Sequence, residues 1–355
     1  MALQISEMAR FTKVFLQALG YELAPVVVTS SELEERLAPM YEKFHFPEGQ
    51  LEELTGIAER RWWEPGTPLS KGAILAAKKA LTNSGVAAAA VGALVYTGVC
   101  RENFEPATAC RVADGVGVSP SAAVYDISNA CLGVLNGILD IANRIELGQI
   151  RAGLVVSCES AREINDIMID RMNSELDMKL FTTALATLTG GSGAVAVLLT
   201  DGSFGDNPGH KLHGGVTQVA PEHHALCRWG LQKRDGALHD EFMATDSVSV
   251  LKHGVALGSR TWQAFLEEMS WTGDSVDKVI CHQVGSEHQK HILKELGIAE
   301  DKDYTTYEFL GNIGTVSLPI TAALAHERGV LNSGDSVGFL GIGSGLNCLM
   351  LGLEW

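Results

Sequence analysis

Short apolar runs alternate with longer stretches of helical periodicity along most of the chain. The runs 93–97 and 151–157 are almost wholly apolar, which is typical of buried strands. Between them, apolar positions repeat three or four residues apart from Val134 to Ile145, as in a helix buried in a core. Strands that alternate with helices at this spacing predict an α/β fold.

The same order of elements occurs twice. A helix at 71–82 precedes the strand at 93–97, and a helix at 259–269 precedes a strand at 278–282. In each case a second strand, a glycine-marked loop into an apolar helix, and a third strand follow: 122–133 and 151–157 first, 305–314 and 336–340 later. A last strand is predicted at 347–353.

This repetition predicts two pseudo-symmetric halves, residues 1–205 and 206–355. The segment from Gly202 to Gly215 is rich in Gly, Pro, Asp and His and is a plausible connection between them. The alternative is that two α/β units merely look alike, as such units do. If the halves are related, loops at equivalent positions converge on one cleft at the sheet ends.

Composition and charge narrow the function classes. The 355 residues are 46% hydrophobic and 20% charged, as in an ordinary globular protein. A net charge of −16 argues against a nucleic-acid partner and repels an acidic carrier protein over most of the surface. Small acyl thioesters that dock at a local basic patch, such as Arg60-Arg61 or Lys233-Arg234, are repelled less by this negative charge.

Seven cysteines show no disulfide spacing, and we find no signal peptide or apolar run long enough for a membrane span. We therefore expect a cytoplasmic protein with reduced thiols. His223, His224 and Cys227 lack a second ligand pair at zinc spacing, so neither a metal nor a cofactor is expected.

Cys131 lies where a strand stops and the apolar helix begins, in Asp126-Ile-Ser-Asn-Ala-Cys131-Leu-Gly133. Free backbone N–H groups and the positive dipole end of a helix favour thiolate over thiol, so a nucleophile is expected here. The alternative is an ordinary buried cysteine that packs as a small hydrophobic residue.

Two other segments offer partners for this cysteine. His282 ends the strand at 278–282, and Asn312 lies in the tight loop Gly311 to Gly314. Together the three residue types can act as nucleophile, base and amide stabiliser in acyl transfer, although each alone has a structural interpretation. The small residues of Gly341 to Gly345 allow backbone N–H groups to approach a ligand, as in an oxyanion hole.

These motifs resemble the thiolase superfamily, and within it the ketoacyl synthase III-like condensing enzymes. The matching segments occur in the family's order over essentially the whole chain: Asn129-Ala-Cys131, His282-Gln283, Gly311-Asn-Ile-Gly314 with Ser317-Leu-Pro319, and Gly343-Ser-Gly345. The resemblance implies a five-layered α-β-α-β-α sandwich of two similar halves, usually a homodimer.

The resemblance also implies roles for individual residues. Cys131 takes an acyl group from a thioester, while His282 and Asn312 stabilise the enolate and carbonyl oxygen of the second substrate. The N–H groups of Cys131 and Ser344 form the oxyanion hole. Acyl-CoA is the implied substrate, with acyl carrier protein as a possible partner.

Glu105 separates the subfamilies. Ketoacyl synthase III enzymes commonly carry an apolar residue here that reaches into the partner subunit's tunnel, whereas a glutamate is the implied base in OleA-type enzymes, which join two fatty acyl-CoAs head to head. An unactivated acyl-CoA must lose an α-proton, and a carboxylate in an apolar tunnel is a stronger base. Alternatively, Glu105 caps the turn before Pro106.

The chain departs from the family at the CoA site, where Gln50 and Leu54 stand near the expected Trp and Arg. The substitutes that we consider are Arg60, Arg61, Trp62 and Lys290. The resulting hypothesis is a non-decarboxylative Claisen condensation of two fatty acyl-CoAs through an acyl-cysteine. The alternatives are a decarboxylating 3-oxoacyl-carrier-protein synthase III and a non-catalytic acyl-binding partner subunit.

Overall fold

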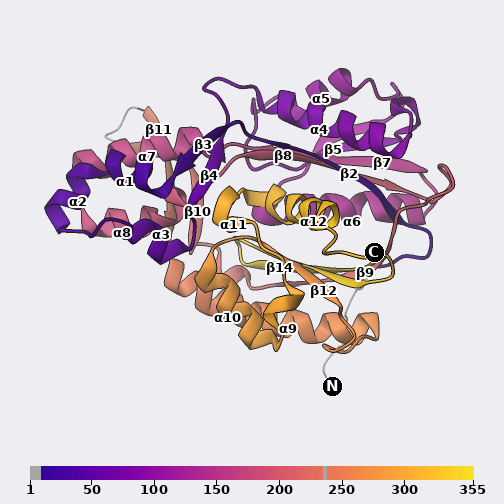
Figure 1. Cartoon of the computed structure of the whole chain (residues 1–355). Coiled ribbons are helices and arrows are strands. Elements are labelled where there is room, and N and C mark those ends of the chain that lie inside the picture. Colours follow the sequence, from indigo (N-terminus) through magenta and orange to yellow (C-terminus); the bar gives the residue numbers. More distant parts are fainter. Residues whose placement is uncertain (1–8, 235–237) are drawn as a thin grey trace.

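The computed structural model describes residues 9–234 and 238–355 and shows five layers (Figure 1). Helices α4 (Leu69–Ser84) and α5 (Thr108–Val116) form the upper layer. Helices α6 (Gly133–Glu146) and α12 (Ser317–Glu327) fill the middle, and α9 (Ser247–Met269) and α10 (Ser286–Leu296) lie below. A sheet layer separates each pair of helical layers, so the expected sandwich is confirmed.

The two sheet layers are joined along one hydrogen-bonded path. Only Phe15 and Leu16 of β2 pair with β9, opposite Lys211 and His210, so the path turns a corner there. The short β1 (Ala9–Arg10) also pairs with β9. Along the path, the strands are β6 (Ala123–Asp126), β5 (Ala93–Tyr96), β7 (Ala152–Glu159), β8 (Gly193–Thr200), β2 (Phe15–Leu23), β9 (His210–Val219), β14 (Asn347–Glu354), β13 (Ser336–Gly343) and β12 (Lys278–Cys281).

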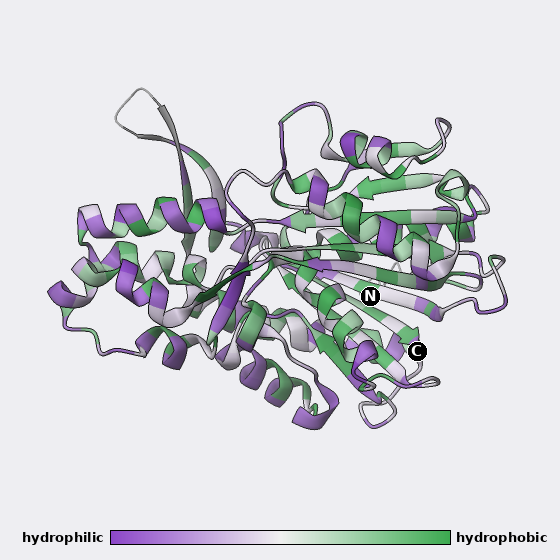
Figure 2. Ribbon diagram, turned by 45° about the horizontal axis from the view of Figure 1, so that its top comes forward, coloured by the Kyte–Doolittle hydropathy of each residue, from purple (hydrophilic) through white to green (hydrophobic). Residues whose placement is uncertain are grey.

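Burial follows the position of each strand in this path. Every residue of β7 and β8 is buried, because helices cover both faces of the sheet there. Figure 2 shows the corresponding hydrophobic ribbons in the sheet layers and hydrophilic turns on the outer helices. In contrast, β6 is an edge strand and is only partly buried.

Most predicted elements are present, with shifted ends. Helix α9 begins at Ser247, twelve residues before the expected start at 259. The second strand expected from Thr305 is wrong, because only an isolated bridge joins Val279 to Asp303 and α11 (Tyr307–Leu310) follows. The Oε1 atom of Gln283 accepts the N–H groups of Thr306 and Tyr307 at 2.9 and 3.3 Å, which withdraws them from strand pairing.

A lobe beside the sandwich has its own core. Met168, Met172 and Phe181 are buried there with Leu33 and Trp62, so these methionines pack in the core of the lobe. Its elements are α1 (Ser30–Arg36), α2 (Ala38–Phe44), α3 (Gln50–Thr55), α7 (Arg162–Glu175), α8 (Met178–Leu188), and the pairs β3 (Val26–Thr29) with β4 (Glu59–Trp62) and β10 (Cys227–Arg234) with β11 (Leu238–Thr245).

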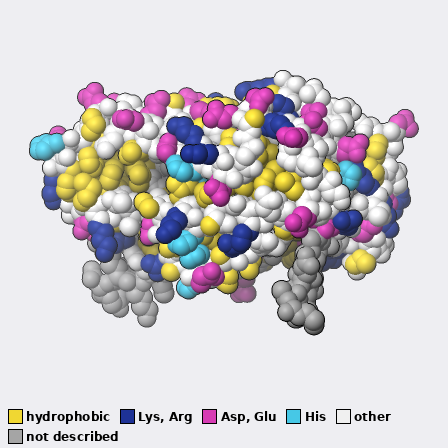
Figure 3. All heavy atoms as spheres, turned by 90° about the horizontal axis from the view of Figure 1, so that it is seen from below, with side chains coloured by type: hydrophobic (Ala, Val, Ile, Leu, Met, Phe, Trp, Pro, Cys, Tyr) yellow, Lys and Arg dark blue, Asp and Glu magenta, His cyan; other side chains and the backbone are white. Residues whose placement is uncertain are grey.

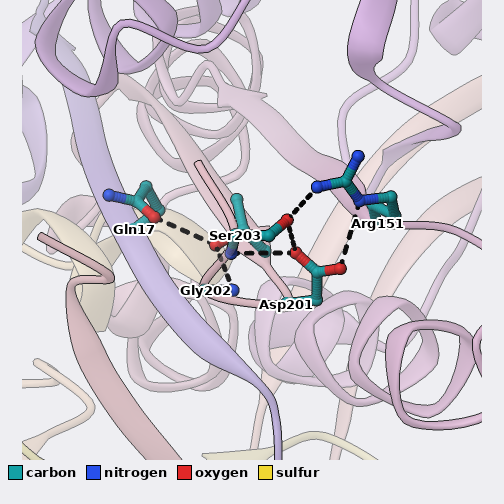
Figure 4. A network of polar contacts seen from close by, with 6 residues as sticks. Gln17, Arg151, Asp201, Gly202 and Ser203 are labelled. Carbon is teal, nitrogen blue, oxygen red and sulfur yellow. Dashed lines mark hydrogen bonds and ion pairs between the residues drawn. The ribbon is translucent and has the colours of Figure 1, made fainter. Parts of the chain in front are cut away.

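The connection from β8 to β9 is fastened by a polar network (Figure 4). The Arg151 Nε donates to Asp201 at 3.3 Å, and the Ser203 N–H donates to the same carboxylate at 3.0 Å. Although partial burial opposes it, hydrogen bonds from Ser203 and Arg151 hold the pKa of Asp201 below its usual value. The proposed boundary at residues 205/206 falls just beyond this network and stays a prediction.

The close packing of β2 on α4 gives a test of the fold. A Cβ atom at Gly20 would lie 2.2 Å from the Ala76 carbonyl oxygen and 2.5 Å from the Ala80 nitrogen. We expect Gly20→Ala to lower the free energy of unfolding by about 3 kcal/mol, since overpacking moves backbone. Gly273→Ala, with open space around the new Cβ, should change it by less than about 0.5 kcal/mol. Urea unfolding measures both, and equal stabilities would contradict this packing argument.

Candidate active site

Cys131 lies in a tight turn between β6 and α6. It is the middle residue of a 3-10 turn, Ala130–Leu132, which leads directly into α6. Ala130 has a φ of 45°, in the left-handed region that a residue with a Cβ rarely occupies. Gly133 is required after this turn, because an added Cβ would lie 2.2 Å from the Thr97 carbonyl oxygen.

The loop that carries Asn312 packs against the same helix start. The Val134 N–H donates to the Thr315 hydroxyl at 2.7 Å, which joins α6 to the 3-10 turn Gly314–Val316. The Asn312 Oδ1 atom accepts the Gly314 N–H at 3.1 Å. This bond orients the amide, so its NH₂ group is the end that can face a substrate oxygen.

His282 follows the last residue of β12. Its N–H donates to the Leu340 carbonyl at 3.0 Å, which places it beside β13. Three residues further along β13, the strand reaches the Cys131 turn: a Cβ at Gly343 would lie 3.5 Å from the Cys131 nitrogen. The structure therefore brings the backbone segments of Cys131, His282 and Asn312 to one region, together with Ser344, which follows Gly343.

Burial determines the protonation of this site. Burial, with smaller contributions from the neighbouring Cys227 and Glu159, raises the pKa of the Cys131 thiol to about 12. Desolvation of this site favours the thiol, which opposes the thiolate expected at the helix start. Burial also lowers the pKa of His282 to about 3, with His288 adding to the effect, so the imidazole is neutral and can accept the thiol proton.

Glu159 is a buried carboxylate that the sequence analysis missed. It accepts the N–H groups of Val99 at 2.9 Å and Cys100 at 3.1 Å, and a Cβ at Gly314 would lie 3.3 Å from its side chain. Burial raises the pKa of Glu159 despite these bonds. A charged residue at the end of the fully buried strand β7 is the signal that could have identified it.

Glu105 lies apart from the Cys131 region in the single chain. It is exposed, near the tip of the loop between β5 and α5, and its neighbour Phe104 is 92% exposed. Both ends of this loop are anchored: Glu159 holds the Val99 and Cys100 N–H groups, and Asp126 accepts the N–H groups at the start of α5. The protein thus presents Phe104 and Glu105 outward on a fixed base.

Two of the residues considered for CoA cannot hold it. Arg60 has no exposed surface, and its guanidinium donates to the Ser30 hydroxyl at 3.0 Å inside the lobe. Trp62 is 1% exposed and donates to the Gly190 carbonyl at 3.0 Å. Both expectations are wrong because β4 is covered by the lobe helices. Arg61 is partly buried, whereas Lys290 is exposed on α10 and pairs with Glu287 at 3.2 Å.

Within residues 9–234 and 238–355, no cluster of three or more His, Cys, Asp and Glu side chains could hold a metal ion. No helix in the same ranges is long and apolar enough to cross a membrane.

The burial around His282 predicts a dependence of stability on pH. Burial lowers the pKa of His288, which lines the cavity beside His282, from 6.5 to about 4. The neutral His288 side chain does not reduce the free energy of unfolding at neutral pH. As the pH falls from 6.5 towards 4, the unfolded chain binds a proton at this residue and the folded protein does not, so the free energy of unfolding decreases. Between pH 7 and 4.5, we expect the wild type to lose about 2 kcal/mol more unfolding free energy than His288→Gln.

Urea unfolding at the two pH values measures this difference. The matched control is His224→Gln, at an exposed position away from His288, which should lose stability in parallel with the wild type. A His288→Gln protein with the same pH dependence as the wild type would contradict the burial argument.

Comparison with known proteins places this arrangement in a family. Residues 266–355 match the model of the 3-oxoacyl-[acyl-carrier-protein (ACP)] synthase III C-terminal domain. The acyl-CoA:acyl-CoA alkyltransferase of Shewanella oneidensis is 60% identical over 98% of this chain and 100% of its own length. That of Xanthomonas campestris is 35% identical over 97% and 99%, and the β-ketoacyl-[acyl-carrier-protein] synthase III of Koribacter versatilis is 28% identical over 96% and 97%.

Solved structures agree. The cerulenin-bound OleA of Xanthomonas campestris superposes with a TM-score of 0.91, at 34% identity and full coverage of both chains. A cysteine-to-serine variant of that enzyme with bound lauric acid and lauroyl-CoA gives a TM-score of 0.90, at 34% identity, over 97% of this chain and 100% of that one. The chain therefore belongs to the acyl-CoA:acyl-CoA alkyltransferase (OleA) family of ketoacyl synthase III-like condensing enzymes.

Proposed function

We propose that the protein condenses two fatty acyl-CoA molecules head to head, without decarboxylation, through an acyl thioester on Cys131. The 60% identity with an acyl-CoA:acyl-CoA alkyltransferase over nearly the whole chain carries this proposal. The product is a β-keto acyl compound. Each step uses side chains of the protein and the two thioesters.

The first half-reaction acylates Cys131. His282, which is neutral, takes the thiol proton as the sulfur attacks the thioester carbonyl, and the oxygen that becomes negative is held by the N–H groups of Cys131 and Ser344. When this intermediate collapses, the bond to the CoA sulfur breaks and CoA leaves with the proton from His282. Pairing a buried thiol with a neutral imidazole avoids a permanent charge in the pocket.

The second half-reaction forms the carbon–carbon bond. A carboxylate removes the α-proton of the second acyl-CoA, and His282 with the Asn312 amide stabilises the enolate oxygen. The enolate carbon attacks the acyl-Cys131 carbonyl, the bond to the Cys131 sulfur breaks, and the leaving thiolate takes up a proton. Release of the α-proton from the carboxyl group balances this uptake, so the thiol and the carboxylate are both restored. No carbon dioxide is released, so this route needs a base that a malonyl donor would not need.

We assign that base to Glu105 of a second copy of the chain in a homodimer. Glu105 is fully outside its own pocket, whereas a carboxylate becomes a strong base only after transfer to an apolar environment. Two observations support insertion into a partner: the exposed Phe104 beside it, and the partly exposed edge strand β6, whose end binds the loop through Asp126. An uncovered edge and an exposed aromatic residue are features of interfaces.

We also propose that CoA approaches between α9 and α10. A narrow cavity of about 40 Å³ lies there beside His282, lined by Val255 and Gly258 of α9 and by Gln289 of α10. Lys290 adjoins Gln289 and is exposed, so it can meet a CoA phosphate. On the lower face in Figure 3, Lys and Arg side chains lie among acidic ones, so local contacts of this kind, rather than one broad basic surface, would bind the nucleotide.

A single substrate tests the reaction class. With myristoyl-CoA alone, we expect release of CoA and a β-keto product, because no malonyl donor is needed. Cys131→Ala should abolish both, while Cys110→Ala, at an exposed position on α5, should keep both near the wild-type level. Mass spectrometry and a thiol assay measure the two products. Strict dependence on malonyl-carrier protein would favour the decarboxylating alternative, and binding without turnover would favour the non-catalytic one.

Mixed dimers test the position of Glu105. We expect Glu105→Gln to acylate Cys131 but to condense at least about 100-fold more slowly, since the base is missing. A mixture of Glu105→Gln and Cys131→Ala chains, unfolded and refolded together, should regain about a quarter of wild-type activity, because half of the dimers then contain one intact site. The control, Glu295→Gln on the exposed part of α10, should match the wild type. A mixture as inactive as its components would contradict a base supplied by the partner.

A further inference from the structure

Both backbone groups of the proposed oxyanion hole lie on separate turns. The Cys131 N–H belongs to the 3-10 turn before α6, and the Ser344 N–H belongs to the turn between β13 and β14. The two turns are far apart in the sequence. Such donors work only when both lie about 2.7–3.1 Å from the developing oxyanion, so their spacing has to be held by something.

One side chain connects the two turns. The Asn347 Nδ2 donates to the Ser344 carbonyl oxygen at 3.1 Å and to the Asn129 Oδ1 at 3.3 Å. The Asn129 Nδ2 in turn donates to the Asn136 Oδ1 at 2.7 Å, on the second turn of α6. A chain of three amides therefore runs from the Ser344 turn, past the residue two positions before Cys131, to the helix that follows Cys131.

The local backbone is adapted to this chain of amides. A Cβ at Gly345 would lie 2.4 Å from the Asn347 Nδ2, and Gly345 has a φ of 131°, so only glycine leaves room for the amide beneath the turn. On the other side, Ala130 is held at a φ of 45° directly between Asn129 and Cys131. A left-handed alanine costs about 1 kcal/mol or more and persists only where its surroundings fix it.

We propose that Asn347, acting through Asn129, is a positioning residue that sets the distance between the Cys131 and Ser344 N–H groups. This proposal rests on the proposed function, because it concerns the oxyanion of that reaction. The proposed role of Asn347 involves no contact with the thiol or with the substrate. On one side it binds the Ser344 carbonyl, which lies in the peptide after the Ser344 N–H, and on the other side it binds the Asn129 side chain beside the nucleophile turn. One amide therefore connects the turns that carry both donors.

The alternative role for Asn347 is packing, and an isosteric change separates the two. Asn347→Asp keeps the shape of the side chain but replaces the NH₂ donor with an acceptor, which faces the Ser344 carbonyl and the Asn129 Oδ1 without a proton to share. We expect acylation of Cys131 by myristoyl-CoA to slow by about 10- to 100-fold, with KM changed by less than about twofold, because the interaction is used in the transition state.

Alkylation of Cys131 by iodoacetamide distinguishes the two roles, because a merely structural role of Asn347 predicts that its loss slows alkylation as well. Displacement of iodide develops no oxyanion, so Asn347→Asp should alkylate within about twofold of the wild type while acylation falls. The surface control is Asn83→Asp, which replaces an exposed amide that donates to the Leu19 carbonyl, and it should change neither rate.

Asn129→Ala tests the other end of the connection. If both residues act through their shared hydrogen bond, the double variant Asn129→Ala/Asn347→Ala should acylate little more slowly than the worse single variant. Three results would each overturn the proposal. These are a double variant whose loss of rate is the product of the two single losses, an unchanged acylation rate in Asn347→Asp, and equal losses of acylation and alkylation. Failure of the wild type itself to form acyl-Cys131 would instead refute the proposed function, so the two failures are distinguishable.

Discussion

The active-site region depends on a close contact between the two halves of the chain, where β13 passes under the nucleophile turn. A Cβ at Gly341 would lie 2.4 Å from Leu135 and 2.6 Å from Leu132, and one at Gly343 would lie 3.2 Å from Leu132. Bare backbone on β13 therefore forms the floor on which the start of α6 rests. Side chains there would force the Cys131 turn away from the second half, and with it from His282 and Asn312.

Desolvation then determines which chemistry is available. The same burial raises the pKa of Cys131 and lowers that of His282, so the resting pair carries no charge. A neutral pair suits a pocket that has to accept an apolar chain, because an unpaired buried charge is costly. Glu105 is in the opposite situation, since it is exposed to solvent in the single chain. In the proposed homodimer, the apolar environment that a base needs comes from the second chain.

Local sequence patterns predicted the elements and the loops that carry the three side chains, because the spacing of apolar residues in a strand or helix indicates which of its faces is buried. These patterns gave wrong predictions where a side chain from a distant part of the sequence changes the local structure. The Gln283 side chain binds the Thr306 and Tyr307 N–H groups and prevents the strand expected there. Arg60 and Trp62 look like surface residues in an Arg-Arg-Trp-Trp run, yet lobe helices from two separate segments cover them. Likewise, Asn129 and Asn347 are 218 positions apart, so their hydrogen bond is invisible to periodicity.

The repeated order of elements explains why so many functional groups meet at one place. In the first half, Thr97, Cys131 and Glu159 follow or end β5, β6 and β7. In the second half, His282 and Ser344 follow β12 and β13, and Asn312 precedes α12 as Cys131 precedes α6. Parallel strands present their carboxyl ends at one edge, and the two edges face each other across α6 and α12. The two parts of the chain therefore present different residue types at one place: Cys131 and Glu159 come from one part, and His282, Asn312 and Ser344 come from the other.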